Sequence, residues 1–368
     1  MSDDPSTTDS QDGGNRPVLQ MDEAPVRRRL ADSQPTTTAG QLKQTFYYMR
    51  GRGAVEIGAV YALIVLFFIG LFLRNSDPVT GFPFLTKPNL SGTLTQAIPV
   101  LAILAIGAGI LMIAGEFDLS MGASLGFSGI VFIKTVNTGQ SWVVALVAAI
   151  ISSMVIALIN GSIVVLTQIP SFIATLGMWL FWNGAALFLN GTSPAIIDKP
   201  DPTMVSVMVG DHGWYRSQLL WMVVVGFVAW WFLHRSKWGN HIYATGGNAA
   251  ATKAVSIKPN SVRLMSFAIM GALVGLAASL TVVRTTTMQP ATTDKLTLIA
   301  IAAAVVGGCS LTGGRGTVIG MIIGAALIRT VENGFIMGKA PGFYLDVFLG
   351  VTIVIAASIN KFMEGRAK

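Results

Sequence analysis

Charged residues are scarce in this sequence of 368 residues, in which only 12% of the side chains are Asp, Glu, Lys or Arg. A soluble globular domain carries roughly 25% charged residues, so this chain cannot cover a soluble surface. Acids are the scarcest group, because seven of the 18 lie before Gly40 and eleven serve the rest of the chain. With 52% hydrophobic residues, the composition indicates a polytopic membrane protein.

Cysteine and metal-ligand patterns are also missing. The single Cys309 excludes a disulfide or a cysteine-based metal site within one chain. The three histidines, His212, His234 and His241, fall in predicted loops without ligand spacing. We therefore expect no metal site and no cofactor in this chain.

Catalytic signatures are absent as well. The spacing GxxxxGK[ST] of a phosphate loop occurs nowhere, and Gly313–Thr317 is better explained as a tight turn before a helix. No Ser/His/Asp or Cys/His cluster is present, so we expect no enzyme and no ATPase site. No basic run with interleaved aromatics lies outside the apolar runs, which argues against nucleic acid as a partner.

Long apolar runs are what the sequence has in abundance, and they predict an all-α fold of about ten transmembrane helices. A helix needs about 20 residues to cross the hydrocarbon core, so the third and eighth runs are short. They are tilted, extended into their loops, or broken helices that line a cavity. The runs are Val55–Leu73, Leu94–Ala114, Met121–Ile133, Trp142–Leu166, Phe172–Leu189, Leu219–Leu233, Val262–Val283, Leu296–Cys309, Thr317–Ile336 and Phe343–Ile359.

Positive charge supports this count and its orientation. With ten spans, sixteen Lys/Arg fall in loops and tails assigned to the cytoplasm and eight in outer loops, as the positive-inside rule requires. Both termini are then cytoplasmic. We expect a disordered tail at 1–41, a transmembrane domain at 42–361 and a short cytoplasmic tail at 362–368.

The loop at 234–262 is the most basic interruption between spans, with no acid in it. Gly246-Gly247 breaks the chain, Asn248 is a helix cap, and Ala249–Val255 favours about two helical turns. Pro259 then disfavours continuation of that helix. A short helix that lies along the membrane face indicates a surface to which another protein binds.

Two segments suggest two loosely related halves. Gly115–Ala123 leads into a glycine-rich span, and Gly308–Gly316 does so again after the eighth run; each half also has Asn-Gly, at Asn160-Gly161 and Asn333-Gly334. Repeated loops of this kind suit a transporter built from repeats, although tight turns that reuse Gly and Ser would look similar. Gly320 and Gly324, four residues apart, favour close helix packing.

A few polar residues near or inside the spans are candidates for function. Glu116 and Asp118 at a span junction either line a pathway, cap the third helix or meet water. Arg329 and Glu332 are three residues apart, so a helix places them on one face. They are either a polar pathway lining or a structural ion pair.

Four segments together resemble one family, the permease subunits of bacterial ABC sugar importers of the ribose type. Gly115–Gly122 is similar to its "GG-I-DLS-VG" segment and Ile169–Met178 to "P-F-I-x-TLG-M". Asn240–Asn248 resembles "G-R-x-I-Y-A-x-GGN", and Ala302–Gly316 resembles "AAVVIGG…GGRG". The resemblance covers roughly Leu85 to Lys361.

The resemblance implies a multi-pass protein of the bacterial inner membrane, in contact with lipid. It implies a second permease subunit, identical or different, an ATPase subunit that binds ATP and Mg, and an external substrate-binding protein. It also implies an ATPase-coupling loop whose candidate residues are Asn240, Gly246, Gly247, Asn248, Ala250, Lys253 and Ile257. Here the family commonly has an acid near Ala249–Ala251, an arginine at Asn240, Gly-Ile at Glu116-Phe117 and Tyr-Glu at Asp294-Lys295.

We therefore expect a permease that moves a monosaccharide or similar small polar solute by alternating access. The alternatives are a permease for nucleosides or branched-chain amino acids, an ion-coupled secondary transporter that uses Arg329 and Glu332, and a membrane scaffold. The candidate pathway residues are Asp118, Asn160, Thr175, Arg329, Glu332 and Asn333.

Overall fold

The structure, a computed structural model, describes residues 54–74, 82–289 and 292–366. The tail expected at 1–41 lies outside the described residues. Helices make up most of the described chain. They are α3 (Ala54–Arg74), the π-helix η1 (Pro88–Leu94), α4 (Thr95–Ile113), α5 (Met121–Asn137), α6 (Trp142–Thr167), α7 (Ser171–Asn190), α8 (Pro202–Val209), α9 (Ser217–Arg235), α10 (Lys237–Gly247), α11 (Ala249–Ala254), α12 (Pro259–Thr285), α13 (Asp294–Val306), α14 (Val318–Met337) and α15 (Phe343–Arg366).

Each of the ten apolar runs overlaps one of these helices. Among the described residues, six helical segments are long and apolar enough to cross a membrane: Pro88–Ile113, α6, α7, α9, α12 and α14. The helices α3 and α15 hold shorter apolar stretches, Tyr61–Leu73 and Phe343–Ile355. The all-α, polytopic class is thus confirmed.

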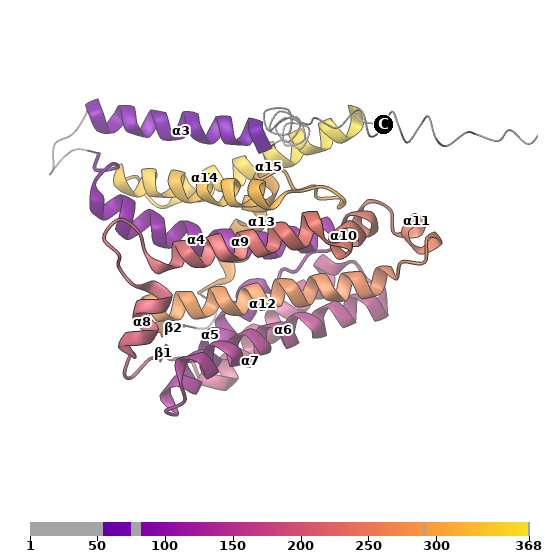
Figure 1. Cartoon of the computed structure of the whole chain (residues 1–368), viewed down its shortest axis with the longest axis horizontal. Coiled ribbons are helices and arrows are strands. Elements are labelled where there is room, and N and C mark those ends of the chain that lie inside the picture. The colour runs from indigo at the N-terminus through magenta and orange to yellow at the C-terminus, as the bar shows by residue number, and fades with distance from the viewer. Residues whose placement is uncertain (1–53, 75–81, 290–291, 367–368) are drawn as a thin grey trace, which may run out of the picture. The chain divides into compact units, whose positions relative to one another are not determined.

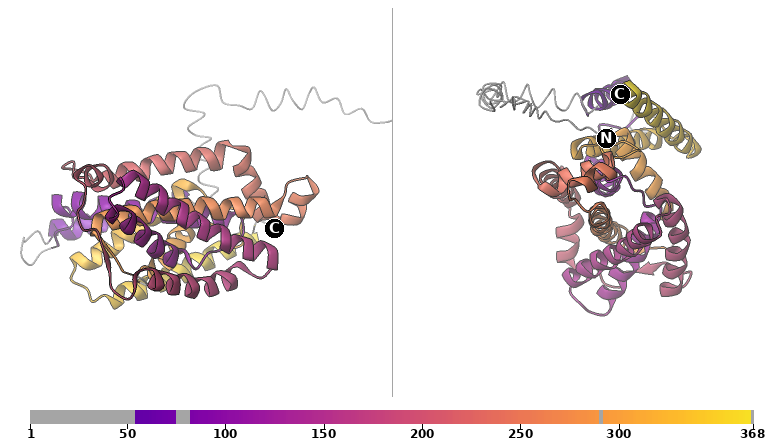
Figure 2. Two further views of the ribbon diagram at one scale, coloured as in Figure 1. Left: turned by 90° about the horizontal axis from the view of Figure 1, so that it is seen from below. Right: turned by 90° about the vertical axis from the view of Figure 1, so that its right-hand side faces the viewer.

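The two ends of the helical unit carry different elements (Figure 1). At one end, called the α8 end here, α8 lies beside the short strands β1 (Ala195–Ile196) and β2 (Thr287–Met288), which pair antiparallel. At the other, the α10 end, α10 and α11 lie between α9 and α12 in sequence. From below, the long helices again run between these ends (Figure 2, left).

Helix starts follow the local sequence. Ser141 and Thr317 accept hydrogen bonds from backbone N–H groups three residues on and so cap α6 and α14. Pro259 is the first residue of α12. The N–H of a first helical residue has no acceptor within the helix, so proline loses no hydrogen bond there. The basic loop holds two helices rather than one, because α10 precedes the expected short helix α11.

Glycines set how closely the helices approach. On α12, a Cβ at Gly271 would lie 2.7 Å from the Ser153 carbonyl oxygen of α6, and one at Gly275 would lie 2.6 Å from that of Ala149. On α14, Cβ atoms at Gly320 and Gly324 would overlap carbonyl oxygens of α13 and of the residue after it. The close packing expected from the Gly320 and Gly324 spacing is confirmed.

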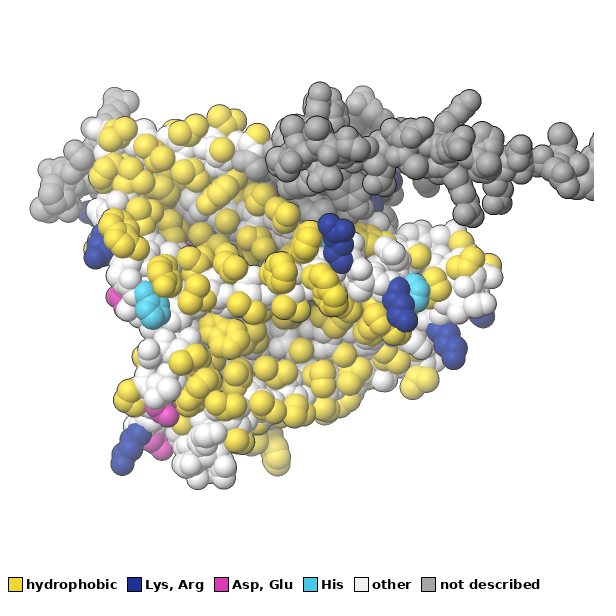
Figure 3. Space-filling view, viewed as in Figure 1, with side chains coloured by type: hydrophobic (Ala, Val, Ile, Leu, Met, Phe, Trp, Pro, Cys, Tyr) yellow, Lys and Arg dark blue, Asp and Glu magenta, His cyan; other side chains and the backbone are white. Residues whose placement is uncertain are grey.

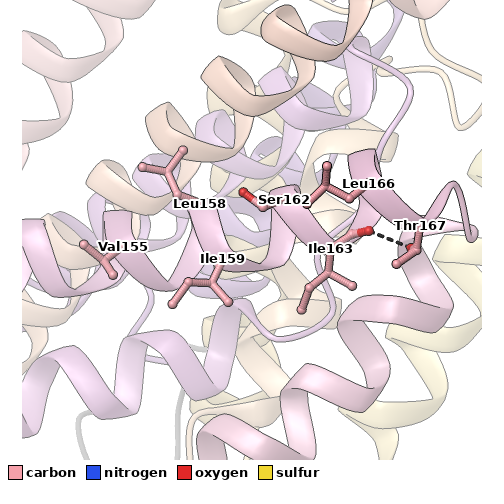
Figure 4. A pocket seen from close by; sticks show the side chains of 7 residues that line it. All are labelled: Val155, Leu158, Ile159, Ser162, Ile163, Leu166 and Thr167. Carbon is pink, nitrogen blue, oxygen red and sulfur yellow. Dashed lines mark hydrogen bonds between the residues drawn. The ribbon is translucent and has the colours of Figure 1, made fainter.

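Hydrophobic side chains cover much of the face formed by α9 and α12, while Lys and Arg gather towards the two ends (Figure 3). The exposed face of α6 is also apolar. A shallow hollow of about 430 Å³ runs along it, lined by residues of α6 alone (Figure 4). Its members recur at helical spacing and are mostly aliphatic, which suits contact with lipid. They are Val155, Leu158, Ile159, Ser162, Ile163, Leu166 and Thr167.

The suggested internal repeat has a structural counterpart in two helix ends. After α4, the N–H of Gly115 donates to Met112 O and that of Glu116 to Leu111 O. After α13, Gly308 and Cys309 repeat the same pair of bonds. Gly115 and Gly308 have φ of 88° and 89°, so both ends are Schellman motifs with glycine at the left-handed position.

Candidate functional site

The two short helices, α5 and α13, meet at their N-termini. The N–H of Gly122 donates to Thr297 Oγ1 at 2.7 Å, and Thr293 Oγ1 donates to the Gly122 carbonyl at 2.7 Å. A Cβ at Gly122 would lie only 2.6 Å from the Thr293 carbonyl oxygen. Glycine is therefore required for this contact between two helix starts that are 171 residues apart.

This meeting point lies inside the helical unit rather than at its end. Asp294, the first residue of α13, accepts hydrogen bonds from Trp179 and Asn183, which lie near the middle of α7. Because α13 has 13 residues, it is about 20 Å long, shorter than a hydrocarbon core of about 30 Å. Of the three explanations for the short eighth run, a broken helix fits this geometry.

Asp118 lies in the loop before α5 and is buried at 5% exposure. Its Oδ1 accepts from the N–H of Ser120 at 2.7 Å and from Ser120 Oγ at 2.6 Å. Its Oδ2 accepts from the amide of Asn160 on α6 at 3.2 Å, and Trp182 Nε1 on α7 donates to Asn160 Oδ1 at 3.1 Å. Two of the predicted pathway residues, Asp118 and Asn160, thus belong to one network, in which the structure shows the carboxylate ordering the start of α5.

Thr175, a third predicted residue, holds the same loop from α7. Its Oγ1 accepts from the N–H of Leu119 at 3.0 Å and donates to the Ser171 carbonyl at 2.8 Å. Ser171 Oγ in turn accepts from the N–H of Phe117 at 3.0 Å. These hydroxyls satisfy two backbone donors of the loop, and Thr175 itself is fully buried.

A small cavity of about 10 Å³ borders Asp118, and its other lining residues are apolar. This volume is about that of one water molecule. The space beside Asp118 therefore holds no sugar in this conformation, and an open pathway requires the helices around it to move. Its lining is Ala108, Leu111, Met112, Phe117, Asp118, Met121, Met270 and Ile301.

Asp294, Trp179 and Asn183 form a second cluster of polar side chains, called the Asp294 group. It is more exposed than the cluster around Asp118, called the Asp118 group. Trp179 Nε1 donates to Asp294 Oδ1 at 2.8 Å and Asn183 Nδ2 donates at 3.1 Å. All three side chains are half-buried. The Asn183 Oδ1 has no hydrogen-bond partner among the described residues, so this group keeps an unused acceptor.

The remaining predicted pathway residues lie elsewhere, on α14. Arg329 and Glu332 form an ion pair with each other, as their spacing predicts, and their side chains are 14% and 21% exposed. Asn333 exchanges two side-chain hydrogen bonds with Asn89 of η1, at 2.7 and 2.9 Å. Within the described part of the chain, none of these three is hydrogen-bonded to the Asp118 or Asp294 groups.

The predicted coupling residues lie at the α10 end. Asn248 caps α11, because its Oδ1 accepts from the N–H of Ala251 at 3.0 Å, as expected from the sequence. On α11, Ala250 and Lys253 are exposed, so the helix presents an outward face without an acid. Asn240 and Gly247 are also exposed, whereas Gly246 and Ile257 are half-buried.

Glu116 pairs with a residue that the sequence did not suggest. Its Oε1 lies 3.0 Å from Nε of Arg263, in the second turn of α12, and the two side chains are 8% and 23% exposed. No cluster of three or more His, Cys, Asp or Glu that could hold a metal occurs among the described residues.

Sequence reasoning missed the polar face of α7 and its partner Asp294. A signal was present, since Trp179, Trp182 and Asn183 are spaced at i, i+3 and i+4 and share one helix face. An acid directly before a short apolar run was a second signal. Ser120, which bridges Asp118 and Asn160, carried no signal beyond its position before a helix.

Long apolar helices, buried polar networks and two short helices that meet inside the helical unit are together typical of a membrane transport protein. Residues 89–357 match the family described as the branched-chain amino acid transport system / permease component. The chain belongs to this family and is a multi-pass inner-membrane protein.

Curated relatives cover most of the chain. The ribose import permease protein RbsC of Escherichia coli K12 is 31% identical over 285 residues, which span 75% of this chain and 87% of that protein. The autoinducer 2 import system permease protein LsrC of Salmonella typhi is 28% identical over 306 residues, 81% of this chain and 83% of the relative. No solved structure matches the chain.

Proposed function

We propose that the chain is the permease subunit of an ABC importer for a monosaccharide or similar small polar solute. A separate ATPase subunit binds ATP and Mg, an external binding protein delivers the solute, and this chain itself has no catalytic role. The relatives named as ribose and autoinducer 2 import permeases support this substrate class.

The half-buried Asp294 group carries the proposal. A carboxylate at the depth of mid-α7 costs about 2.5–3.5 kcal/mol when it is placed among acyl chains. The face formed by Trp179, Asn183 and Asp294 therefore meets water, solute or a second permease subunit rather than lipid. Indole N–H, amide and carboxylate groups suit the hydroxyls of an uncharged sugar.

We assign the solute path to the region where α5 and α13 meet, between the Asp118 and Asp294 groups and against a second permease subunit. In the orientation with ten spans and both termini cytoplasmic, the α10 end faces the cytoplasm and the ATPase. The α8 end then faces the binding protein. The three residues Arg329, Glu332 and Asn333 serve the packing of α14 in this proposal.

Transport in proteoliposomes tests the proposal. The chain is reconstituted with its ATPase subunit and binding protein, and uptake of ribose, a nucleoside and leucine is measured with ATP and with a non-hydrolysable analogue. Sugar uptake that requires hydrolysis supports it. Uptake of leucine or a nucleoside alone contradicts the substrate class, and ion-driven uptake without the ATPase contradicts the whole mechanism.

A further inference from the structure

Four glycines from three separate segments touch one another at the α10 end. We call Gly115, Gly246, Gly313 and Gly314 the glycine junction. A Cβ at Gly246 would overlap the carbonyl oxygen of Ile113, and a Cβ at Gly313 would lie 2.7 Å from the Gly246 carbonyl oxygen and 3.1 Å from the Gly115 Cα. The last turn of α10 thus packs, backbone against backbone, on the loops that follow α4 and α13.

Hydrogen bonds fix these three segments to one another. The N–H of Gly314 donates to the Ile113 carbonyl at 2.9 Å, which joins the two loops. The Tyr243 hydroxyl of α10 donates to the Gly316 carbonyl at 2.7 Å. Because backbone atoms are in contact, no flexible side chain can absorb a displacement of α10.

An ion pair joins the next residue of the loop to α12. Glu116 follows Gly115 directly, and its partner Arg263 lies only a few residues after Pro259, where the chain enters α12 from α11. The chain on both sides of α11 therefore contacts the same loop: Gly246 before α11 lies against Gly115, and Arg263 after α11 pairs with Glu116.

The same loop, residues 114–120, connects α4 to α5 at the candidate site. Phe117 and Leu119 are hydrogen-bonded to Ser171 and Thr175 of α7, and Asp118 is bonded to Asn160 of α6. A displacement of Gly115 and Glu116 would therefore also displace residues 117–119, whose hydrogen bonds order the start of α5.

We propose that the glycine junction and the Glu116–Arg263 ion pair form the mechanical link between the ATPase-facing helices and the solute path. Glu116 is assigned as a positioning residue, because in the proposed function the ATPase subunit binds the nucleotide and the solute passes between the Asp118 and Asp294 groups. The inference rests on the proposed importer function and adds to it which contacts transmit the movement.

The substitution Glu116→Gln tests the link in the reconstituted transporter, with solute moved per ATP hydrolysed as the readout. We expect uptake to fall at least tenfold while the ATPase rate stays within twofold, so that coupling is lost. The matched control is Asp346→Asn, which removes the exposed Lys295–Asp346 pair, 3.1 Å long, and should leave the ratio unchanged. An unchanged ratio in Glu116→Gln overturns the inference.

A double variant separates a lost link from general damage. If the two side chains act as one unit, Glu116→Gln with Arg263→Gln should lower coupling no further than the worse single variant. Two tenfold losses that multiply to a hundredfold would show independent roles and overturn the link.

Hydrogen exchange gives a readout that does not depend on transport. In the wild-type complex, addition of ATP should change amide exchange in both 248–258 and 114–120. In Glu116→Gln the change in 248–258 should remain and that in 114–120 should disappear. Persistence of both changes overturns the link, whereas a wild-type complex without ATP-driven uptake contradicts the importer function instead.

Discussion

Asp118 precedes α5 and Asp294 begins α13, and the two carboxylates lie near the point where these helices meet. Asp118 is buried and all of its bonds go to protein groups, Ser120 and Asn160. Asp294 is half-buried and is held on one side only, by Trp179 and Asn183 of α7. A polar residue in a membrane protein can thus either stabilise the structure around a site or form part of its accessible surface. Its burial and its hydrogen-bond partners distinguish the two roles.

Removal of the Asp118 carboxylate should have the largest effect. Asp118→Ala leaves the N–H and the hydroxyl of Ser120 without their acceptor and removes one of the two acceptors of the Asn160 amide, the other being Ser120 Oγ. This loss costs about 3 kcal/mol or more. We expect a lower unfolding temperature in detergent and less protein in the membrane. Asp118→Asn, which keeps an acceptor oxygen, should lose about 1 kcal/mol.

Full stability of Asp118→Ala together with lost uptake would contradict this assignment. Such a result would show that Asp118 acts in transport rather than in the stability of the site, as proposed for Asp294.

The contact between the two helix starts should be the next most sensitive. In Gly122→Ala the new methyl group would lie 2.6 Å from the Thr293 carbonyl oxygen, so α5 and α13 must separate at a cost of about 2 kcal/mol. Gly177→Ala on α7 is the control, because nothing lies within 4 Å of that position. Equal unfolding temperatures for the two variants would show that the helices do not depend on this contact.

Asp294 should affect transport more than stability. Asn at this position still accepts from Trp179 and Asn183, so Asp294→Asn should change the free energy of unfolding by less than about 1 kcal/mol. Uptake should fall about tenfold, equivalent to about 1.4 kcal/mol, because a carboxylate acceptor for solute hydroxyls is lost. Unchanged uptake at saturating and limiting solute would exclude Asp294 from the path.

Much of the fold could be predicted from the sequence. The apolar runs depend on composition alone, and each of the ten overlaps a helix. The Asn248 cap of α11 and the Arg329–Glu332 pair were predictable because each depends on residues within three positions of one another. Such local features need no knowledge of which helices become neighbours.

The site was only partly predictable for the same reason. Asp118, Asn160 and Thr175 were identified as polar residues in or near apolar runs, and the structure brings them around one loop. Pairs such as Glu116 with Arg263 or Trp179 with Asp294 join residues more than 100 positions apart, which no spacing rule supplies. Asn333 satisfied the same rule as Asn160 yet bonds to η1.

Acids also mark where this chain departs from the pattern that its sequence resembles. Glu116 stands where Gly is common and Asp294 where Tyr is common. One lies in the proposed link and the other in the proposed path, whereas α11 has no acid.

The smallest effect concerns the loop that follows α13. This loop begins with the same Schellman motif as the loop that follows α4, but it has Cys309 at the position equivalent to Glu116. Burial raises the pKa of the Cys309 thiol to about 12. At pH 8 the folded thiol should therefore react with a maleimide about a thousandfold more slowly than in unfolded protein. Since the unfolded thiol loses its proton first, stability should decrease as the pH rises from about 9 towards 12. Cys309→Ala should remove that decrease, and rapid labelling of the folded chain would show that the loops after α4 and α13 are not equally closed.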